Sequence, residues 1–317
     1  MRIAVAGSVA TDHLMSFPGR FNDSLMADQL HNVSLSFLVD DLQIRRGGVA
    51  ANICFGMGTL GGAPVLVAAV GQDFAEYGDW LSAQGVDCTQ VHISQTAHTA
   101  RFMCTTDQEQ NQIASFYPGA MSESVRLDIA HVSESVGGVD LVLIGPDDPA
   151  AMVAHTQRCR ELGIAFVADP SQQLPRLDGP ATRELIDGAA YLFNNEYESQ
   201  LIEQRTGWSQ DDVLARVGVR ITTLGKNGAR IQTRDGLNLV VPVAREEVIQ
   251  DPTGVGDAFR AGFLMGLSLS LIHISEPTRR TPVGTQEFTV VPTVFVERFA
   301  EAYGPDAAAE IAVHLRR

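Results

Sequence analysis

The strongest chemical signal in the chain is the run DPTGVGDAFRAGF from Asp251 to Phe263. Its glycine-flanked turn leads into a helix that we expect to begin near Val255. The first N–H groups of a helix lack internal partners and carry the positive end of its dipole, and Gly254 and Gly256 leave room for an anion to approach them. Asp257 lies in the first turn, where its carboxylate can accept the proton of an alcohol. An anion site beside a general base is what phosphoryl transfer to an alcohol needs.

Other catalytic motifs are weaker or absent from the sequence. A shorter GxGD pattern would fit an ordinary helix N-terminus, where the dipole favours an acidic residue, but the full run favours the functional interpretation. Residues Gly56–Gly61 match GxGxxG, yet they end a predicted helix instead of following a strand, so we interpret them as a small-residue helix end packed against the sheet. The sequence contains no GxSxG, GxxxxGK[ST], HxxxH or HExxH motif, which argues against a serine hydrolase, a Walker-type ATPase and a zinc site.

The composition is that of a globular enzyme with an acidic charge balance. The chain has 317 residues, of which 45% are hydrophobic and 19% charged, and its formal net charge is −15. The sequence contains no Lys/Arg-rich run that would neutralise a nucleic-acid backbone. It also contains no stretch of the roughly 18 apolar residues that are needed to span a bilayer. The N-terminus lacks a signal-peptide pattern, and the four cysteines show no CxxC spacing. We therefore expect a cytoplasmic protein with reduced thiols that binds neither nucleic acid nor membrane.

Short apolar runs alternate with helical patterns along the chain. Most of the runs are nearly continuous in Val, Ile, Leu and Ala, as expected for parallel strands covered on both faces. This alternation predicts an α/β fold with a doubly wound, mostly parallel central sheet flanked by helices, in which ligands bind at the carboxyl ends of the strands. We expect strands at Ile3–Ser8, Val65–Val70, Asp140–Gly145, Ala165–Asp169, Tyr191–Asn194 and Val219–Leu224, and helices at Val49–Leu60, Phe74–Gln84, Ala150–Leu162, Ala181–Asp187, Glu196–Gln204, Ala258–Leu267 and Asp306–Leu315.

Four further segments predict a small second sheet. Asp12–Phe17, Leu35–Leu42, Thr99–Thr105 and Gln112–Tyr117 have strand patterns that interrupt the alternation. Their clustering before residue 118 favours a β-sheet lid, inserted at about 12–46 and 98–118 into one domain that spans residues 1–317. The alternative is that these segments are edge strands of the main sheet.

The chain resembles the ribokinase-like, or phosphofructokinase-B type, family of carbohydrate and nucleoside kinases. The run from Asp251 to Phe263 is similar to the family's C-terminal motif, and Arg46–Asn52 is similar to its N-terminal motif. Asn194–Glu198 resembles the family's Asn-x-x-Glu element, and Thr222–Gly228 resembles its nucleotide loop. These four motifs occur in the family's order, so the resemblance covers most of the chain.

The resemblance assigns roles to the motif residues. It implies that ATP and Mg²⁺ are the cofactors, with a monovalent cation such as K⁺ as a further candidate. It also implies that Asp257 is the general base of a kinase. The other implied residues are Gly254, Val255 and Gly256 in the anion hole, Asn195 and Glu198 at the magnesium ion, and Thr223, Gly225 and Gly228, together with Gly254, Gly256 and Asn195, at the nucleotide.

Within this family the chain is most similar to adenosine kinases of the actinobacterial type. That similarity implies transfer of the γ-phosphoryl group of ATP to the 5′-hydroxyl of adenosine, and a homodimer formed through the lid. A flat purine suits aromatic faces, although spacing alone favours packing between lid strands for the two phenylalanines, and Asp12 could be a turn or cap residue. The similar runs are Gly7–His13, Val33–Phe37, His98–Phe102, Ser115–Ala120 and Asp169–Gln173. They imply Asp12, Gly48 and Asn52 at the ribose, Ser8, Ser36, Gln172 and Gln173 around the nucleoside, and Phe102 and Phe116 on the two sides of the base.

Other functions stay open at this point. A ribokinase-like sugar kinase, or a kinase for another purine nucleoside, would use the same machinery. A protein that binds nucleoside without turnover is favoured by the anomalous segment 269–283, where Pro277 and Pro282 interrupt the helical pattern. The segment is similar to a translated sequencing adapter, so we hypothesise that an artefact replaced a native stretch there. An NAD-dependent oxidoreductase rests only on the GxGxxG match at Gly56–Gly61.

Overall fold

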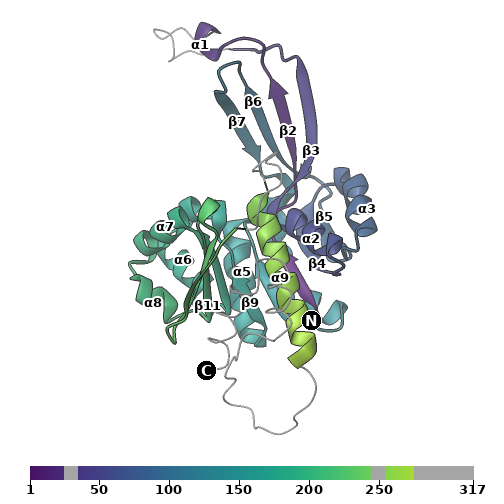
Figure 1. The fold of residues 1–317 in the computed structure, drawn as a ribbon. Coiled ribbons are helices and arrows are strands. Elements are labelled where there is room, and N and C mark those ends of the chain that lie inside the picture. The colour runs from purple at the N-terminus through teal and green to yellow at the C-terminus, as the bar shows by residue number, and fades with distance from the viewer. Residues whose placement is uncertain (25–34, 244–253, 275–317) are drawn as a thin grey trace.

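The computed structural model of the protein describes residues 1–24, 35–243 and 254–274. These residues form a nine-stranded sheet between layers of helices and a four-stranded sheet that projects from it (Figure 1). The expected doubly wound α/β fold with a separate small sheet is therefore confirmed. The helix expected at Asp306–Leu315, and the anomalous segment from residue 275 onward, lie outside the described residues.

The nine-stranded sheet is parallel except at one edge, where two hairpin strands pair antiparallel. The sequence analysis placed six of its strands within two residues of their observed ends but missed β5, β12 and β13, which are short or only partly buried and so lack a continuous apolar run. In spatial order the strands are Asn238–Val241 (β13), Ala229–Thr233 (β12), Val219–Thr223 (β11), Tyr191–Asn195 (β10), Ala165–Ala168 (β9), Leu141–Ile144 (β8), Ile3–Ala6 (β1), Val65–Val70 (β4) and Val91–Ile93 (β5).

Helices cover both faces of this sheet, and alternate residues of each strand supply two separate cores. Val5 and Leu143 belong to one hydrophobic cluster, whereas their neighbours Ala4 and Val142 belong to the other. Burial on both faces explains why the strand sequences are almost continuously apolar. The first cluster is covered by Val49–Thr59 (α2), Ala75–Ala83 (α3) and Val255–Ile274 (α9), and the second by Ile129–Ser135 (α4), Pro149–Leu162 (α5), Gly179–Ile186 (α6), Glu196–Thr206 (α7) and Gln210–Leu214 (α8).

The long helix α9 packs along α2. A Cβ on Gly56 of α2 would approach the Ala261 Cβ to 2.7 Å, so the Gly56–Gly61 stretch is a helix end, as predicted, and Gly56 is the point of its close contact with α9. We expected the helical pattern to fail from Leu269, yet α9 continues to Ile274 because this stretch contains no proline or glycine. Neither α9 nor any other helix in the described part of the chain is long and apolar enough to cross a membrane.

The four-stranded sheet, which we call the lid, has the strand order β3-β2-β6-β7. The strand expected at Leu35–Leu42 is wrong, because β2 pairs along its whole length with Asp41–Gly47 instead. The apolar residues before it serve another purpose: the ring of Phe37 packs on Phe17 and Phe21, with ring centroids 4.9 and 5.0 Å apart. Phe21 begins the short helix α1, which lies at the distal end of the lid (Figure 1). The lid strands are Ala10–Ser16 (β2), Asp41–Gly47 (β3), Ala100–Thr106 (β6) and Gln112–Tyr117 (β7).

Strand register sorts the lid residues onto two faces. Asp12, Phe102 and Phe116 are paired in one row across β2, β6 and β7, so their side chains share what we call the Asp12 face. The adjacent row places Ile44 on the opposite face, which we call the Ile44 face. Exposed apolar side chains of that second face include Leu42, Ile44, Ile113 and Tyr117.

Asp73 fastens the base of the lid to the main sheet. It follows β4, and its Oδ1 accepts hydrogen bonds from the Thr99 backbone N–H and hydroxyl at 2.8 and 2.7 Å. Its Oδ2 accepts a hydrogen bond from Arg101 of β6 at 2.8 Å. Burial opposes ionisation of Asp73, but these hydrogen bonds outweigh it and lower its pKa to about 2. The carboxylate therefore stays charged and holds β6 in place throughout the neutral range.

Candidate active site

Several predicted residues collect at the edge of the main sheet where its parallel strands end. Ser8 follows β1, Gln172 and Gln173 follow β9, Asn195 ends β10, and Thr223 ends β11. Parallel strands have all their carboxyl ends at the same edge, which is where doubly wound sheets bind ligands. The fold thus brings these predicted residues to one edge, and it assigns no role to any one of their side chains.

Asp257 is tied to helix α2. The side-chain amide of Asn52 donates a hydrogen bond to Asp257 Oδ2 at 2.8 Å, which joins the first turns of α2 and α9. Burial raises the pKa of Asp257, while the Asn52 bond and the charge of Arg260 lower it in part and the charge of Asp169 raises it. A carboxylate whose pKa is raised, and which a neighbour orients, is suited to accept a proton.

The glycine turn before Asp257 is open at the start of α9. Gly254 has φ +79°, a backbone conformation that favours glycine, and its carbonyl accepts the Ala258 N–H at 2.9 Å. Val255 is 61% exposed, and Gly256 is exposed as well. Solvent, or an anion, can therefore reach the start of the helix, where backbone N–H groups lack partners. Residues 251–253 of the motif lie outside the described residues.

A buried ion pair that the sequence analysis did not predict lies beneath this turn. Arg260 is 7% exposed, and its Nε and Nη2 bind the two carboxylate oxygens of Asp169, Nη2 at 2.7 Å from Oδ1. Its Nη1 donates to the Gly256 carbonyl oxygen at 3.0 Å. Asp169, at the end of β9, is fully buried. The arginine stands alone in the apolar helix pattern after Asp257, and nothing near it in sequence indicates Asp169 as its partner.

Gly48 allows the chain to pass close to the backbone that connects β1 to β2. It precedes α2 with φ +94°, and a Cβ there would lie 2.6 Å from the Ala10 nitrogen and from the Ser8 carbonyl oxygen. The Ser8 hydroxyl accepts the Val49 N–H at 3.2 Å, so this predicted nucleoside ligand also caps the start of α2. Gly48 and Asn52, which the sequence analysis assigned to the ribose, thus both lie at the start of α2. Asn52 also bonds to Asp257 there.

Asp12 lies in the middle of β2, so it is neither a turn residue nor a helix cap. Its carboxylate lies against Gly47 of β3, where a Cβ would approach Oδ2 to 2.8 Å. The Tyr77 hydroxyl of α3 donates to the Gly47 carbonyl at 3.1 Å and fixes this strand end. Burial raises the pKa of Asp12, and the neighbouring His13 and Arg45 lower it. The carboxylate is therefore a partly buried acid on the lid face that also carries Phe102.

The remaining nucleoside candidates are dispersed. Ser36 is exposed beside Phe37 of the distal aromatic group, and no described contact joins it to the Asp257 region. Gln172 is exposed, whereas Gln173 is buried and accepts a long hydrogen bond from Arg176 at 3.4 Å. The roles that the resemblance implied for these three residues stay predictions.

The predicted nucleotide loop connects β11 to the antiparallel hairpin. Gly225 and Gly228 have φ of +56° and +91°. A Cβ on Gly228 would lie 1.9 Å from the Val241 carbonyl oxygen of β13, so this glycine is required by the close approach of two strands. Thr223, one residue from the turn, is half-buried. The loop follows β11 as expected, although the presence of glycine at position 228 is explained by strand packing alone.

Asn195 and Glu198 form a reciprocal capping box at the start of α7. The Glu198 N–H bonds to Asn195 Oδ1 at 2.8 Å, and the Asn195 N–H bonds to Glu198 Oε2 at 2.7 Å. Burial raises the pKa of Glu198, which is 9% exposed. Within the described ranges no group of three or more His, Cys, Asp or Glu side chains could hold a metal ion. A single carboxylate fits Mg²⁺ that is bound mainly through substrate phosphates.

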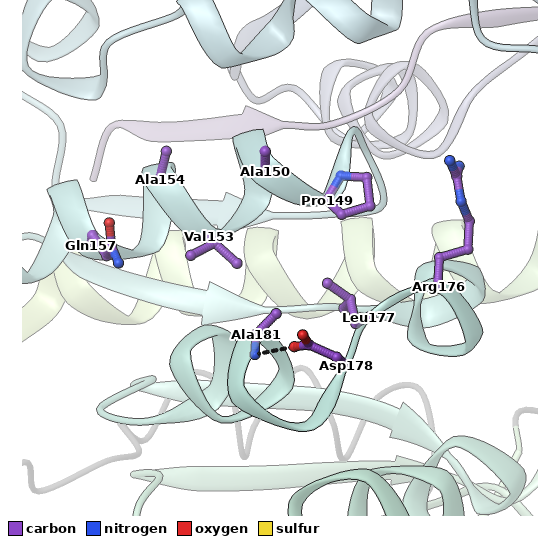
Figure 2. Close-up of a pocket in the computed structure, with 9 residues that line it drawn as sticks. All are labelled: Pro149, Ala150, Val153, Ala154, Gln157, Arg176, Leu177, Asp178 and Ala181. Atoms are coloured by element: carbon purple, nitrogen blue, oxygen red, sulfur yellow. Dashed lines mark hydrogen bonds between the residues drawn. The ribbon is translucent and has the colours of Figure 1, made fainter.

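A shallow groove lies apart from these residues, between α5 and the segment that leads into α6 (Figure 2). Its walls are mostly apolar. Asp178, one of its few polar residues, accepts the Ala181 N–H at 2.8 Å and so caps α6. None of the predicted site residues lines the groove, and we assign it no function.

Comparison with known proteins shows which family the chain matches. The model of the pfkB family of carbohydrate kinases matches residues 9–271. A nucleoside kinase of Methanocaldococcus jannaschii is 30% identical over 220 residues, which is 69% of this chain and 70% of that protein. The structure of a Burkholderia thailandensis nucleoside kinase in complex with inosine has 37% sequence identity and a TM-score of 0.73, and covers 84% of this chain and 82% of its own. The structure of that kinase in complex with ADP-inosine has 35% identity and a TM-score of 0.71, and covers 95% and 96%.

Proposed function

The chain belongs to the pfkB family of carbohydrate kinases, and we propose that it transfers the γ-phosphoryl group of ATP to the 5′-hydroxyl of a purine nucleoside, with adenosine as its substrate. The nucleoside kinases among its relatives support the nucleoside class. The observation that carries the proposal is the position of Asp257, whose carboxylate lies directly after an exposed glycine turn at a helix start and is oriented by Asn52.

The lid and the strand ends would bind the nucleoside from two sides. Asp12 accepts hydrogen bonds from ribose hydroxyls, and Asn52 and the Gly48 backbone bind the same ribose. Phe102 and Phe116 contact the base from the Asp12 face of the lid. Aromatic faces suit a flat purine, and a few amides and hydroxyls set its orientation. Those polar groups are Ser8, Ser36, Gln172 and Gln173.

The reaction then proceeds by in-line displacement. The 5′-oxygen of the nucleoside forms a bond to the γ-phosphorus as the bond from that phosphorus to the β-phosphate oxygen breaks, and ADP leaves with the electron pair. Asp257 accepts the proton of the 5′-hydroxyl. The backbone N–H groups from Gly254 to Gly256 stabilise negative charge on the transferred group. Closure of the lid excludes the water that would compete with the nucleoside.

The nucleotide would lie along the β11 loop, with Mg²⁺ at the start of α7. Thr223, Gly225 and Gly228 would contact ATP. Asn195 and Glu198 would lie at the Mg²⁺ ion. Mg²⁺ neutralises phosphate charge when it is bound. A monovalent cation such as K⁺ is a further cofactor to be tested by its addition to the assay.

Adenosine and inosine are the two candidate substrates to separate. The motif resemblance favours adenosine, whereas the relative that was solved with inosine favours a 6-oxopurine nucleoside. The test is an ADP-release assay with ATP and Mg²⁺ that compares adenosine, inosine, guanosine, cytidine and ribose at equal concentrations. The highest kcat/KM with adenosine supports the proposal. A preference for inosine corrects the substrate, and preference for ribose replaces the nucleoside class. Calorimetric binding of adenosine without any ADP release would show a binding protein instead of a kinase.

The exposed Ile44 face of the lid supports a homodimer formed through the lid. Burying Leu42, Ile44 and Ile113 against a second copy would remove apolar surface from water. Light scattering after gel filtration should give the mass of a dimer, and Ile44→Asp should give a monomer. We place the reaction in the cytoplasm, where the four free cysteines would stay reduced.

A further inference from the structure

Arg260 connects two elements that must be in register for the proposed reaction. Its guanidinium binds Asp169, which directly follows β9, and the Gly256 carbonyl, which belongs to the glycine turn of α9. Arginine can bind a carboxylate through two parallel N–H groups, and this geometry restricts both partners. The start of α9 is thereby fixed to the sheet at the edge where the ligands bind.

The contact with Gly256 is close. A Cβ on Gly256 would lie 3.1 Å from Arg260 Nη1, so the guanidinium fills the space directly beside this glycine. The Phe193 ring lies on another side of it, 5.4 Å from the guanidinium carbon. Arg260 is 7% exposed, and each of its three side-chain nitrogens donates a hydrogen bond within the protein. It is therefore buried and held in one position beneath the turn.

The charges around Asp257 come from several elements. Arg260 on α9 favours its ionised form, and Asp169 after β9 opposes it. Glu198 on α7 acts on Arg260 from a third element. Helix α2, which also packs there, contributes only uncharged side chains, among them Asn52. Removal of Arg260 and removal of the Asp169 charge should thus affect Asp257 in opposite directions.

We infer that the Arg260–Asp169 pair is a positioning device that holds the Gly254–Gly256 turn against the end of β9 and balances the charge beside Asp257, without contacting the substrate. This inference rests on the proposed phosphoryl transfer. Arg260 and Asp169 are positioning residues, and the reacting atoms are handled by Asp257 and the turn.

Three variants of the full chain test the inference. Arg183→Lys is the control, because the guanidinium of Arg183 also binds a backbone carbonyl, that of Thr206, but lies on another helix. Arg260→Lys keeps the charge but loses the contact through two N–H groups, so kcat should fall about tenfold or more. The nucleoside KM should change less than about threefold. The acid limb of the kcat/KM profile should stay in place because the charge is kept. Arg260→Met should move the acid limb up by about one pH unit, and Asp169→Asn should move it down by a similar amount.

Hydrogen–deuterium exchange gives a readout that does not depend on turnover. The Ala258 amide, which bonds to Gly254 in the first turn of α9, should exchange at least about tenfold faster in Arg260→Lys than in the wild type. Arg183→Lys should leave it unchanged. If Arg260→Met or Asp169→Asn fails to fold, Arg260→Lys and this exchange measurement still decide the question.

Two results would overturn the inference: an Arg260→Lys enzyme with kcat within about twofold of the wild type, or unchanged exchange at the start of α9. Acid limbs that move in the same direction in Arg260→Met and Asp169→Asn would remove its electrostatic part. A wild-type chain that phosphorylates no nucleoside would instead contradict the proposed function, and the exchange data would still show whether the pair fixes the turn.

Discussion

The amide of Asn52 and the carboxylate of Asp257 are hydrogen-bonded at 2.8 Å although 205 positions separate them in sequence. Each belongs to a different motif, one at the start of α2 and one at the start of α9. Since the two helices pack on the same face of the sheet, the contact brings the ribose candidates and the general-base candidate into one place. Substitution of either Asn52 or Asp257 should therefore affect the same site.

Replacing Asp257 by Asn should separate catalysis from binding. Without the base, turnover should fall by at least about 10²-fold, while calorimetry should still detect adenosine. Burial raises the pKa of Asp257, so its ionised form is disfavoured in the folded protein, and removing that charge should not lower the thermal midpoint. Near-normal turnover in Asp257→Asn would exclude the base assignment.

Asn52→Ala should change the pH dependence of the enzyme. The Asn52 hydrogen bond lowers the pKa of Asp257, so its loss should raise that pKa and move the acid limb of kcat/KM to higher pH. Activity should therefore fall more at pH 6 than at pH 8.5, beyond any uniform loss of ribose binding. The exposed Asn238→Ala on β13 is the control. A drop of equal size at both pH values would mean that Asn52 does not act on Asp257.

The two faces of the lid should respond differently to mutation. Phe102→Ala removes a ring from the Asp12 face, and loss of a stacking contact worth about 1–3 kcal/mol should raise the nucleoside KM by about 5-fold to 150-fold. Ile44→Ala, on the other face, should leave KM within about twofold. Steady-state kinetics with adenosine measures both. An unchanged KM in Phe102→Ala would favour the alternative that this ring only packs between lid strands.

The main sheet was predictable because its strands are buried on both faces. Val65–Val70 is fully buried and was located without error from its continuous apolar run. The lid was harder: the apolar run at Leu35–Leu42 indicated a strand, but Phe37 packs in an aromatic group, and the pairing strand is the exposed, polar Asp41–Gly47. Exposed strands are defined by their partner, here β2, and carry little pattern of their own.

The site was predictable as a set of motifs but not as a set of contacts. Asp257 and Asn52 were named from separate motifs, and only the fold shows that they touch. The Arg260–Asp169 pair had no local pattern at all, because its partners lie 91 positions apart on a helix and a strand end. Long-range pairs of this kind depend on the packing of α9 over the sheet, which no short window of sequence contains.

Gly48→Ala should destabilise the fold more than a comparable glycine elsewhere. A Cβ at position 48 would lie 2.6 Å from backbone atoms of Ser8, Val9 and Ala10, and its φ of +94° is unfavourable for alanine. Gly61→Ala is the matched control, since Gly61 has φ +85° but nothing within 4 Å. Urea unfolding should show that Gly48→Ala lowers the free energy of unfolding by more than Gly61→Ala does. The loss in Gly61→Ala comes from backbone strain alone, about 1–3 kcal/mol. Equal losses would mean that the close approach of residue 48 to Ser8 and Ala10 relaxes at little cost.

Asp147 should make the stability of the protein depend on pH. It lies in the loop after β8, and burial raises its pKa to about 7, against the smaller lowering effects of the Asp148 N–H and the nearby Ser124 hydroxyl. Its Oδ1 accepts the Asp148 N–H at 2.8 Å, whereas Oδ2 is buried without a hydrogen-bond partner of good geometry. Between the ordinary carboxyl pKa of 3.8 and about 7 the folded chain therefore holds a proton that the unfolded chain has released.

Stability from this carboxyl is consequently present at low pH and is lost as the pH rises toward 7, by up to about 4 kcal/mol. Asp147→Asn mimics the neutral acid, so the free energy of unfolding of the wild type should fall relative to that of Asp147→Asn between pH 4 and pH 8. The exposed Asp79→Asn should show no such trend. Because the neighbouring Pro146 carbonyl accepts the Ser8 N–H at 2.9 Å, loosening of this loop at high pH should also weaken adenosine binding. A wild-type chain whose stability tracks that of Asp147→Asn across the whole range would mean that solvent reaches this carboxyl.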